Sequence, residues 1–364
     1  MKILILSNIA EGLYLFRKEL LLELRKKGHY VVASVPRGEY FDEISSMVDE
    51  VLDTSLDRRG MNPFRDLKLV MAYFQILRQV KPDCVLTYTI KPNLYGGIVS
   101  QICGVPYLLN ITGLGSTFFK DTYLRKILIL LYKISVKGSD GVFFQNQYNK
   151  CMLDNFNIQG RNAILLPGSG VNLEYNNFET YPQKTEPLKF LFVARVMRDK
   201  GINELIEAIR ILKKKYSTLE FHIVGWCEEG YEKCIQSWVE EELIIYHGPQ
   251  KNVHTYMKCC HCLIHPSYHE GLSNVCLEAA ATGRPILASD IPGCRETFDN
   301  GESGLSFQPQ HVESLVNTIE RFIRLPYDKK VNMGKKGRKK IEEQFSRQLV
   351  VDAYMKEINK IEGE

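Results

Sequence analysis

Short apolar runs alternate with longer amphipathic stretches along the first half of the chain. The runs predict strands, and the stretches between them, such as 16–27, 63–80 and 123–137, have the periodicity of helices. Strands that are apolar on both faces are typical of a parallel sheet covered by helices on both sides. The predicted strands of this half are 3–6, 31–35, 84–87, 107–110, 142–145 and 164–166.

A polar segment with two prolines, 180–187, interrupts the pattern, which then restarts with a helix at 202–216. The chain length of 364 residues also exceeds what one core usually organises. We therefore predict two doubly wound, Rossmann-like α/β domains, 1–182 and 183–345, with a helix at about 345–364 that packs back on the first domain. Two such domains place a ligand cleft between the carboxyl ends of their sheets. The strands predicted in the second domain are 190–194, 221–224, 262–265 and 286–288.

Composition excludes several classes of protein. Apolar residues make up 45% and charged residues 25%, which are ordinary globular values and argue against disordered or collagen-like chains. No apolar run approaches the roughly 18 residues needed to cross a bilayer. Residues 1–7 resemble a first strand more than a signal peptide. We expect a cytoplasmic protein whose membrane contact, if any, is peripheral.

The net charge of +4 is too small to indicate a nucleic-acid partner, but it is unevenly spread. Residues 1–180 contain 21 Lys and Arg against 17 Asp and Glu, whereas the remainder contains 26 of each. This excess fits either a solvated surface or a weak anionic partner such as a membrane. The basic and apolar segment 124–137 lies in the same half, and it is either a membrane-surface helix or an interior helix.

Ten cysteines show no repeated spacing, which favours a reduced cytosolic protein over a disulfide framework. Residues 259–262, Cys-Cys-His-Cys, are the place to consider a metal. However, Cys262 heads an apolar run that predicts a buried strand, where cysteine behaves as a small hydrophobe. We therefore predict structural cysteines and no metal site.

The segment 265–285 predicts a strand, a glycine-containing turn and an alanine-rich helix. Ser273 or Asn274 is placed to cap that helix. The backbone N–H groups that precede the helix would then form a site for phosphate oxygens at the positive end of the helix dipole. These groups belong to Gly271, Leu272 and Ser273.

Charged residues flank this turn and a second turn earlier in the chain. Glu270 lies before the helix and Glu278 in its second turn, so one carboxylate can face a sugar while the other accepts hydrogen bonds from ribose hydroxyls. Arg195 and Lys200 lie five residues apart where strand 190–194 gives way to a helix. Two such cations can clamp a diphosphate.

These motifs resemble those of the family-4 retaining glycosyltransferases of the GT-B fold, and the resemblance covers essentially the whole chain. Glu270 and Glu278 match the family's E-x₇-E signature, and Arg195 with Lys200 and Gly201 matches its diphosphate-binding pair. The resemblance implies that Glu278 holds the nucleotide ribose, that Arg195 and Lys200 hold the diphosphate, and that Glu270 touches the donor sugar. It also implies a retaining transfer in which the sugar nucleotide is a substrate and no cofactor takes part.

The N-terminal segments 87–93 and 110–118 look like the subgroup that builds bacterial capsular and exopolysaccharide repeat units. This implies a UDP-sugar donor, a lipid-linked glycan acceptor and an acceptor side that includes Lys91, Thr112 and Gly113. The chain departs from the pattern at two positions. Thr112 stands where many relatives have a histidine, and Asn172 stands where relatives usually have an aspartate.

Three alternatives are weighed against a glycosyltransferase. A dehydrogenase lacks its fingerprint, because Gly113-Leu-Gly115 is not followed by a third glycine at position 118. A sugar-nucleotide epimerase does not account for the paired glutamates with Arg195 and Lys200. A non-catalytic sugar-nucleotide-binding subunit does not require all four donor-side residues. The sequence therefore favours a glycosyltransferase.

Overall fold

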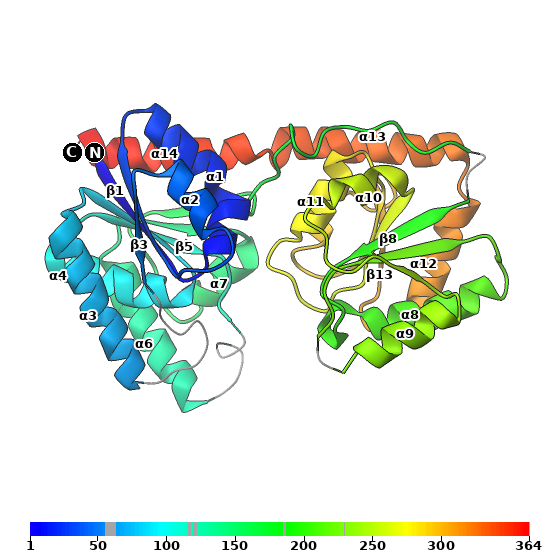
Figure 1. Ribbon diagram of the computed structural model, residues 1–364, viewed down its shortest axis with the longest axis horizontal. Helices are drawn as coiled ribbons and strands as arrows, with labels where there is room; N and C mark the ends of the chain where they lie inside the picture. The colour runs from blue at the N-terminus through cyan, green and yellow to red at the C-terminus, as the bar shows by residue number, and fades with distance from the viewer. Residues whose placement is uncertain (55–62, 116–117, 119–121, 185–186, 229, 364) are drawn as a thin grey trace. The chain divides into compact units, whose positions relative to one another are not determined.

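The computed structural model of the chain describes residues 1–54, 63–115, 118, 122–184, 187–228 and 230–363 (Figure 1). Ser116 and Thr117 of the segment 110–118 therefore lie outside the described residues. The chain divides into two compact units. The first contains Met1–Ser169 and Arg347–Glu364, and the second contains Gly170–Ser346.

The described strands of the first unit form a seven-stranded parallel sheet, in the order β3-β2-β1-β4-β5-β6-β7. The order reverses between β1 and β4, which creates the topological switch point typical of doubly wound sheets. The strands are β1 (Lys2–Ser7), β2 (Tyr30–Val35), β3 (Glu50–Asp53), β4 (Cys84–Tyr88), β5 (Tyr107–Ile111), β6 (Gly141–Phe144) and β7 (Ala163–Leu165).

Helices cover both faces of this sheet and bury one apolar stripe each. On one face, α1 and the C-terminal helix α14 share a core with β1 and β2, and Val351, Tyr354 and Ile358 of α14 are buried there. On the other face, α3, α4 and α6 share a second core. The helices are α1 (Ala10–Lys26), α2 (Phe41–Met47), α3 (Pro63–Val80), η1 (Pro92–Gly96), α4 (Gly97–Cys103), α6 (Tyr123–Lys137), α7 (Gln147–Asp154) and α14 (Arg347–Gly363).

The second unit repeats this architecture with a six-stranded parallel sheet in the order β10-β9-β8-β11-β12-β13. Its strands are β8 (Lys189–Val193), β9 (Glu220–Val224), β10 (Ile245–Tyr246), β11 (Cys262–His265), β12 (Ile286–Ser289) and β13 (Gly304–Phe307). Its helices are η2 (Arg198–Lys200), α8 (Ile202–Lys213), α9 (Glu232–Glu240), α10 (His254–Cys259), α11 (Asn274–Ala281), η3 (Arg295–Thr297), α12 (Val312–Arg324) and α13 (Tyr327–Gln344).

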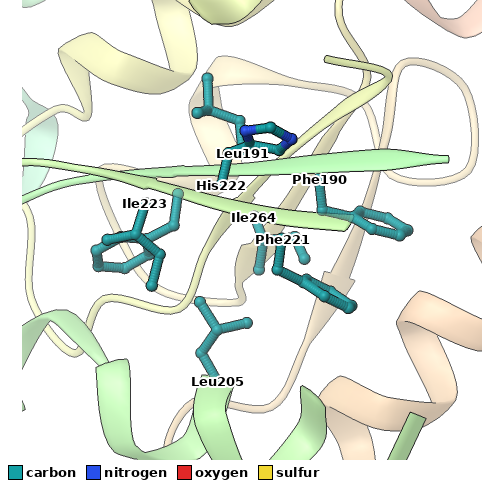
Figure 2. Close-up of a pocket in the computed structure, with 8 residues that line it drawn as sticks. Phe190, Leu191, Leu205, Phe221, His222, Ile223 and Ile264 are labelled. Atoms are coloured by element: carbon teal, nitrogen blue, oxygen red, sulfur yellow. The ribbon is translucent and has the colours of Figure 1, made fainter. Parts of the chain in front are cut away.

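The core of the second unit is closely packed between the sheet and α8. Figure 2 shows side chains of β8, β9, β11 and α8 around a small space, and all of them are apolar except His222. The space is too small to hold a water molecule. It is a packing gap, and we assign no binding role to it.

The boundary between the units lies at 169/170, earlier than the boundary at 182/183 predicted from the polar segment. Residues 170–182 belong to the second unit because side chains of that unit hold their backbone. The buried Arg284 donates to the carbonyl oxygens of Glu179 and Thr180 at 3.0 and 2.9 Å. Tyr181 in turn donates to the carbonyl oxygen of His261 at 2.9 Å. These contacts join residues that are 80 to 105 positions apart in the sequence, which is why local composition did not reveal them.

Within the described part of the chain, none of the helices combines the length and the apolar character that a membrane span requires.

Candidate functional site

The two donor-side motifs lie at the same edge of the second sheet. Arg195 and Lys200 follow β8, and the turn that contains Glu270 follows β11. β8 and β11 are neighbouring parallel strands, so their carboxyl ends meet at one edge. This edge is where doubly wound sheets bind ligands.

Two glycines hold the loops of this edge close together. Gly201 has a φ of 71°, and a Cβ atom there would collide with the carbonyl oxygen of Pro266. Gly293 has a φ of 88°, and a Cβ atom there would come within 2.7 Å of the carbonyl oxygens of Glu270 and Gly271. Both positions lie in the left-handed region that favours glycine. The close approach of three loops therefore depends on these two residues.

Glu270 is the most strongly held charge of the site. One carboxylate oxygen, Oε1, accepts a hydrogen bond from Lys200 Nζ at 2.6 Å and lies 3.0 Å from His265 Nε2. The side chain is only 15% exposed. Burial alone would raise the pKa of Glu270, but the hydrogen bond from His265 and the charges on His265 and Lys200 outweigh burial and lower it to about 2. Glu270 is therefore a fixed carboxylate at neutral pH.

His265 supports Glu270 from within the core, and sequence reasoning did not assign it this position. Burial alone would lower the pKa of His265, but Cys276 and the Glu270 carboxylate reverse this effect and raise it. Its Nδ1 atom is buried and has no hydrogen-bond partner in the structure. A signal was present in the sequence, because a histidine at the end of a predicted strand precedes Glu270 by five residues.

Among the described residues, one buried group has atoms placed to bind a metal ion. The ring of His265 and the thiols of Cys276 and Cys294 offer ligand atoms within 4.8 Å of one another. The segment 259–262, considered on sequence grounds, does not form this group. Cys262 instead lies in β11 and its thiol donates to the carbonyl oxygen of Pro285 at 3.2 Å. The expected absence of a metal stays a prediction.

The N-terminus of α11 lies four residues after Glu270. Ser273 is the N-cap, and its hydroxyl accepts a hydrogen bond from the N–H of Cys276 at 3.4 Å. Asn274 is the first residue of the helix. However, the N–H of Ser273 donates to the carbonyl oxygen of Gly293 at 2.8 Å. The expectation that this N–H would face a phosphate is therefore wrong, because the loop around Gly293 packs against it.

The remaining donor-side positions in this turn and helix differ in exposure. Leu272 is 9% exposed and packs in the apolar core next to the N-terminus of α11. Gly271 and Glu278 are partly exposed. Glu278 lies in the second turn of α11, four residues after Asn274, so the two share one face of the helix.

Arg195 is more exposed than Lys200 and has different partners. Its Nη1 atom lies 2.9 Å from Glu228 Oε1, and the two side chains are 39% and 36% exposed. The guanidinium group also lies over the indole ring of Trp226, 5.6 Å from the ring centre. The sequence motif did not indicate either partner, because Trp226 and Glu228 follow the neighbouring strand β9.

The acceptor-side residues lie in the first unit at the carboxyl ends of two neighbouring strands. Thr112 and Gly113 directly follow β5, and Lys91 comes three residues after β4. Lys91 forms a largely buried ion pair with Asp66 of α3, with Nζ 2.9 Å from Oδ1. This pair attaches α3 to the end of β4, which gives Lys91 a structural contact in addition to its predicted acceptor-side role.

The segment 87–93 also has a structural role in the first unit. The hydroxyl of Thr87 donates to Asn93 Oδ1 at 2.7 Å, and the amide of Asn93 donates to the carbonyl oxygen of Asn110 at 2.8 Å. These bonds link the ends of β4 and β5. Thr89 adopts a φ of 74°, an uncommon conformation for a residue with a branched side chain.

Comparison with known families agrees with this geometry in both halves of the chain. Residues 2–146 match the family described as glycosyl transferase 4-like. Residues 175–340 match the family described as glycosyl transferases group 1. The chain is a glycosyltransferase of the two-domain GT-B class.

Two relatives of this glycosyltransferase come from bacteria. It is 26% identical to the N,N'-diacetylbacillosaminyl-diphospho-undecaprenol alpha-1,3-N-acetylgalactosaminyltransferase of Campylobacter jejuni, and the match covers 88% of each chain. It is 25% identical to the capsular polysaccharide biosynthesis glycosyltransferase CapM of Staphylococcus aureus, over 96% of this chain and 94% of CapM. The fold of this glycosyltransferase is also that of Anabaena HepE solved with UDP and glucose, with a TM-score of 0.80, 17% identity and coverage of 99% and 100%.

Proposed function

We propose that this glycosyltransferase moves a sugar from a UDP-sugar to a lipid-linked glycan, with retention of the anomeric configuration, in the synthesis of a bacterial surface polysaccharide. One observation carries the proposal. The largely buried carboxylate of Glu270 is held ionised by Lys200 and His265 before the N-terminus of α11 and on the same sheet edge as Arg195. A sugar diphosphate needs such a set of fixed charges of both signs.

The chemistry of the transfer explains why both signs are needed. As the bond between the sugar and the diphosphate breaks, negative charge grows on the leaving phosphate and positive character grows on the sugar. We propose that Arg195 and Lys200 meet the phosphate, together with backbone N–H groups near Gly271. We propose that the fixed carboxylate of Glu270 meets the sugar. We propose that Glu278 holds the ribose, so that the donor spans from α11 to Glu270.

The relatives support the identity of the two substrates. HepE was solved with UDP and glucose, which favours a UDP-linked donor for a chain of the same fold. The name of the Campylobacter enzyme gives its acceptor as a sugar on diphospho-undecaprenol, a membrane lipid. CapM belongs to capsular polysaccharide synthesis. We therefore propose a lipid-linked acceptor, with the enzyme working at the cytoplasmic face of the membrane.

Transfer assays with purified enzyme test this proposal. UDP-sugars are supplied one at a time with an undecaprenyl diphosphate-linked monosaccharide, and the product is followed by radiolabel and its anomeric configuration by NMR. We expect transfer from at least one UDP-sugar with retention, and UDP should raise the melting temperature, because a ligand of the folded state stabilises it by mass action.

Three outcomes separate the proposal from its alternatives. Conversion of the UDP-sugar into another UDP-sugar without acceptor would indicate an epimerase. Stabilisation by UDP-sugars without turnover, over a panel of lipid-linked acceptors, would indicate a binding subunit. Transfer with inverted configuration would leave a glycosyltransferase but contradict the retaining mechanism.

A further inference from the structure

The outer face of α3 carries an exposed apolar stripe. Phe64, Leu67 and Met71 are 81%, 60% and 55% exposed. Their spacing of three and four residues places them on one side of the helix. The opposite side is buried in the core of the first unit through Leu69 and Tyr73. The exposed stripe is therefore additional to the apolar face that folding requires.

A second stripe of the same kind lies on α6. Tyr123, Leu130 and Ile134 are 77%, 58% and 42% exposed, and their spacing of seven and four residues again places them on one side. The buried side of α6 contributes Leu128 and Tyr132 to the same core that α3 enters. The segment predicted to be either an interior or a membrane-surface helix is thus buried on one face and apolar on the other.

The two stripes lie on the same side of the first unit. α3 and α6 both pack against η1 and α4, and all of them cover one face of the sheet. Figure 1 shows α3 and α6 together on that face, away from α1 and α14 on the other. Two exposed apolar stripes in one layer of helices form a broader apolar surface than isolated exposed side chains would.

The exposed charges on α3 and α6 themselves are all positive. α6 contains no acidic residue, and its exposed charges are Lys126, Lys133 and Lys137. α3 contains one acidic residue, Asp66, but that carboxylate is buried and paired with Lys91. The exposed charges of α3 are Arg65, Lys68 and Arg78.

The helix α1, on the other face of the same sheet, provides a contrast. It also has exposed leucines, Leu15 and Leu22, at 39% and 50%. However, it mixes its basic residues with Glu11, Glu19 and Glu23. Mixed charge is typical of an ordinary solvated face. α3 and α6 therefore differ from α1 in having no exposed acidic residue.

We infer that the outer faces of α3 and α6 together form a docking surface for an anionic lipid bilayer. The inference rests on the proposed lipid-linked acceptor and adds α3, which the sequence did not indicate. Apolar residues flanked by Lys and Arg are the features of helices that lie in a membrane interface. The apolar side chains enter the boundary of the acyl chains, and the basic side chains meet lipid phosphates.

Co-sedimentation of the full chain with vesicles tests the surface. Vesicles of phosphatidylcholine with about 30% phosphatidylglycerol are compared with vesicles of pure phosphatidylcholine. We expect tight binding to the anionic vesicles alone, and weaker binding at high salt because salt screens exposed charges. Each Lys or Arg near the surface is expected to strengthen binding about fivefold.

Paired substitutions separate the contributions of the two helices. Leu67→Gln with Met71→Gln removes the stripe of α3, and Leu130→Gln with Ile134→Gln removes that of α6. We expect each pair to lower the partition coefficient at least about tenfold, because each loses apolar area that the membrane would bury. Leu15→Gln with Leu22→Gln on α1 is the matched control and should bind as the wild type does.

Several results would overturn the inference. Equal binding of the wild type to neutral and anionic vesicles is one such result, and an α3 pair that binds like the control is another. The third is a wild-type dimer in the absence of lipid that the paired substitutions dissociate, because it would assign the surface to a second copy of the chain. Stabilisation by UDP serves as an independent readout of the donor site. If the wild-type enzyme transfers sugar to a detergent-dissolved acceptor but does not bind vesicles, only this inference is contradicted. Vesicle binding without any transfer contradicts the proposed function instead.

Discussion

Replacing Glu270 by glutamine tests the central charge of the donor site. The substitution keeps the size and the accepting oxygen of the side chain but removes its negative charge. In the structure Glu270 Oε1 accepts a hydrogen bond from Lys200 Nζ at 2.6 Å and lies 3.0 Å from His265 Nε2. The variant therefore leaves Lys200 facing a neutral group and removes the carboxylate that helps to raise the pKa of His265.

The structure gives the magnitude of the effect on stability. Lowering the pKa of Glu270 from its ordinary value of 4.5 to about 2 stabilises the charged form by about 3 kcal/mol. A glutamine retains part of the hydrogen bonding, so we expect a loss of roughly 1–3 kcal/mol in the free energy of unfolding at neutral pH. This is small enough for the variant to fold, and urea unfolding should confirm it before kinetics are measured.

The effect on catalysis should appear in kcat more than in the donor KM. Glu270 is proposed to meet positive character that develops on the sugar, so its charge stabilises the transition state more than the ground state. A charged hydrogen bond contributes roughly 1.5–3 kcal/mol, which corresponds to about a ten- to hundredfold loss of kcat. The assay is donor-dependent kinetics of Glu270→Gln, with Glu228→Gln as the control for a carboxylate that pairs with Arg195. A change in KM with kcat intact would refute the assigned role.

Three further predictions concern the same site. Glu278→Gln should raise the donor KM about ten- to hundredfold with little change in kcat, because ribose contacts stabilise ground and transition states equally; steady-state kinetics that show neither change contradict this role. Activity should survive EDTA, because Arg195, Lys200 and the N-terminus of α11 meet the charge of the leaving diphosphate; loss of activity that magnesium or manganese restores would contradict it. The depressed pKa of Glu270 contributes stability that is present above pH 4.5 and lost as the pH falls towards about 2; urea unfolding across this range should show a steeper loss for the wild type than for Glu270→Gln.

The sequence predicted the central strands of both sheets because they are continuous apolar runs. The predicted strands 3–6, 31–35 and 262–265 agree closely with β1, β2 and β11. Three edge strands, β3, β10 and β13, were missed, whereas the edge strand β7 was predicted as 164–166. β10 has only two residues. β13 begins with Gly304 and contains the polar Ser306 between two apolar residues. Edge strands lack the apolar surface on both faces that makes a central strand visible in sequence.

The residues of the donor site could be identified from the sequence, but the side chains that they contact could not. Arg195, Lys200, Glu270 and Glu278 form local motifs, and adjacency of β8 and β11 brings the motifs together. Nothing local indicates that Lys200 pairs with a residue 70 positions away, or that His265 completes the set. The ion pair of the predicted acceptor-side residue Lys91 could not be predicted either, because its partner Asp66 lies 25 positions earlier, on α3.

The burial of the two ion pairs indicates how a diphosphate would enter the site. The pair between Arg195 and Glu228 is more than a third exposed on both sides, and such pairs contribute roughly 0–1 kcal/mol. Arg195 can therefore leave Glu228 for a diphosphate with little loss of free energy. The pair between Lys200 and Glu270 is far less exposed, at 20% and 15%, and separating it would leave a buried charge without a partner. We therefore propose that Arg195 turns towards a bound donor while Lys200 stays paired with Glu270, so that Lys200 would bridge this carboxylate and the phosphate.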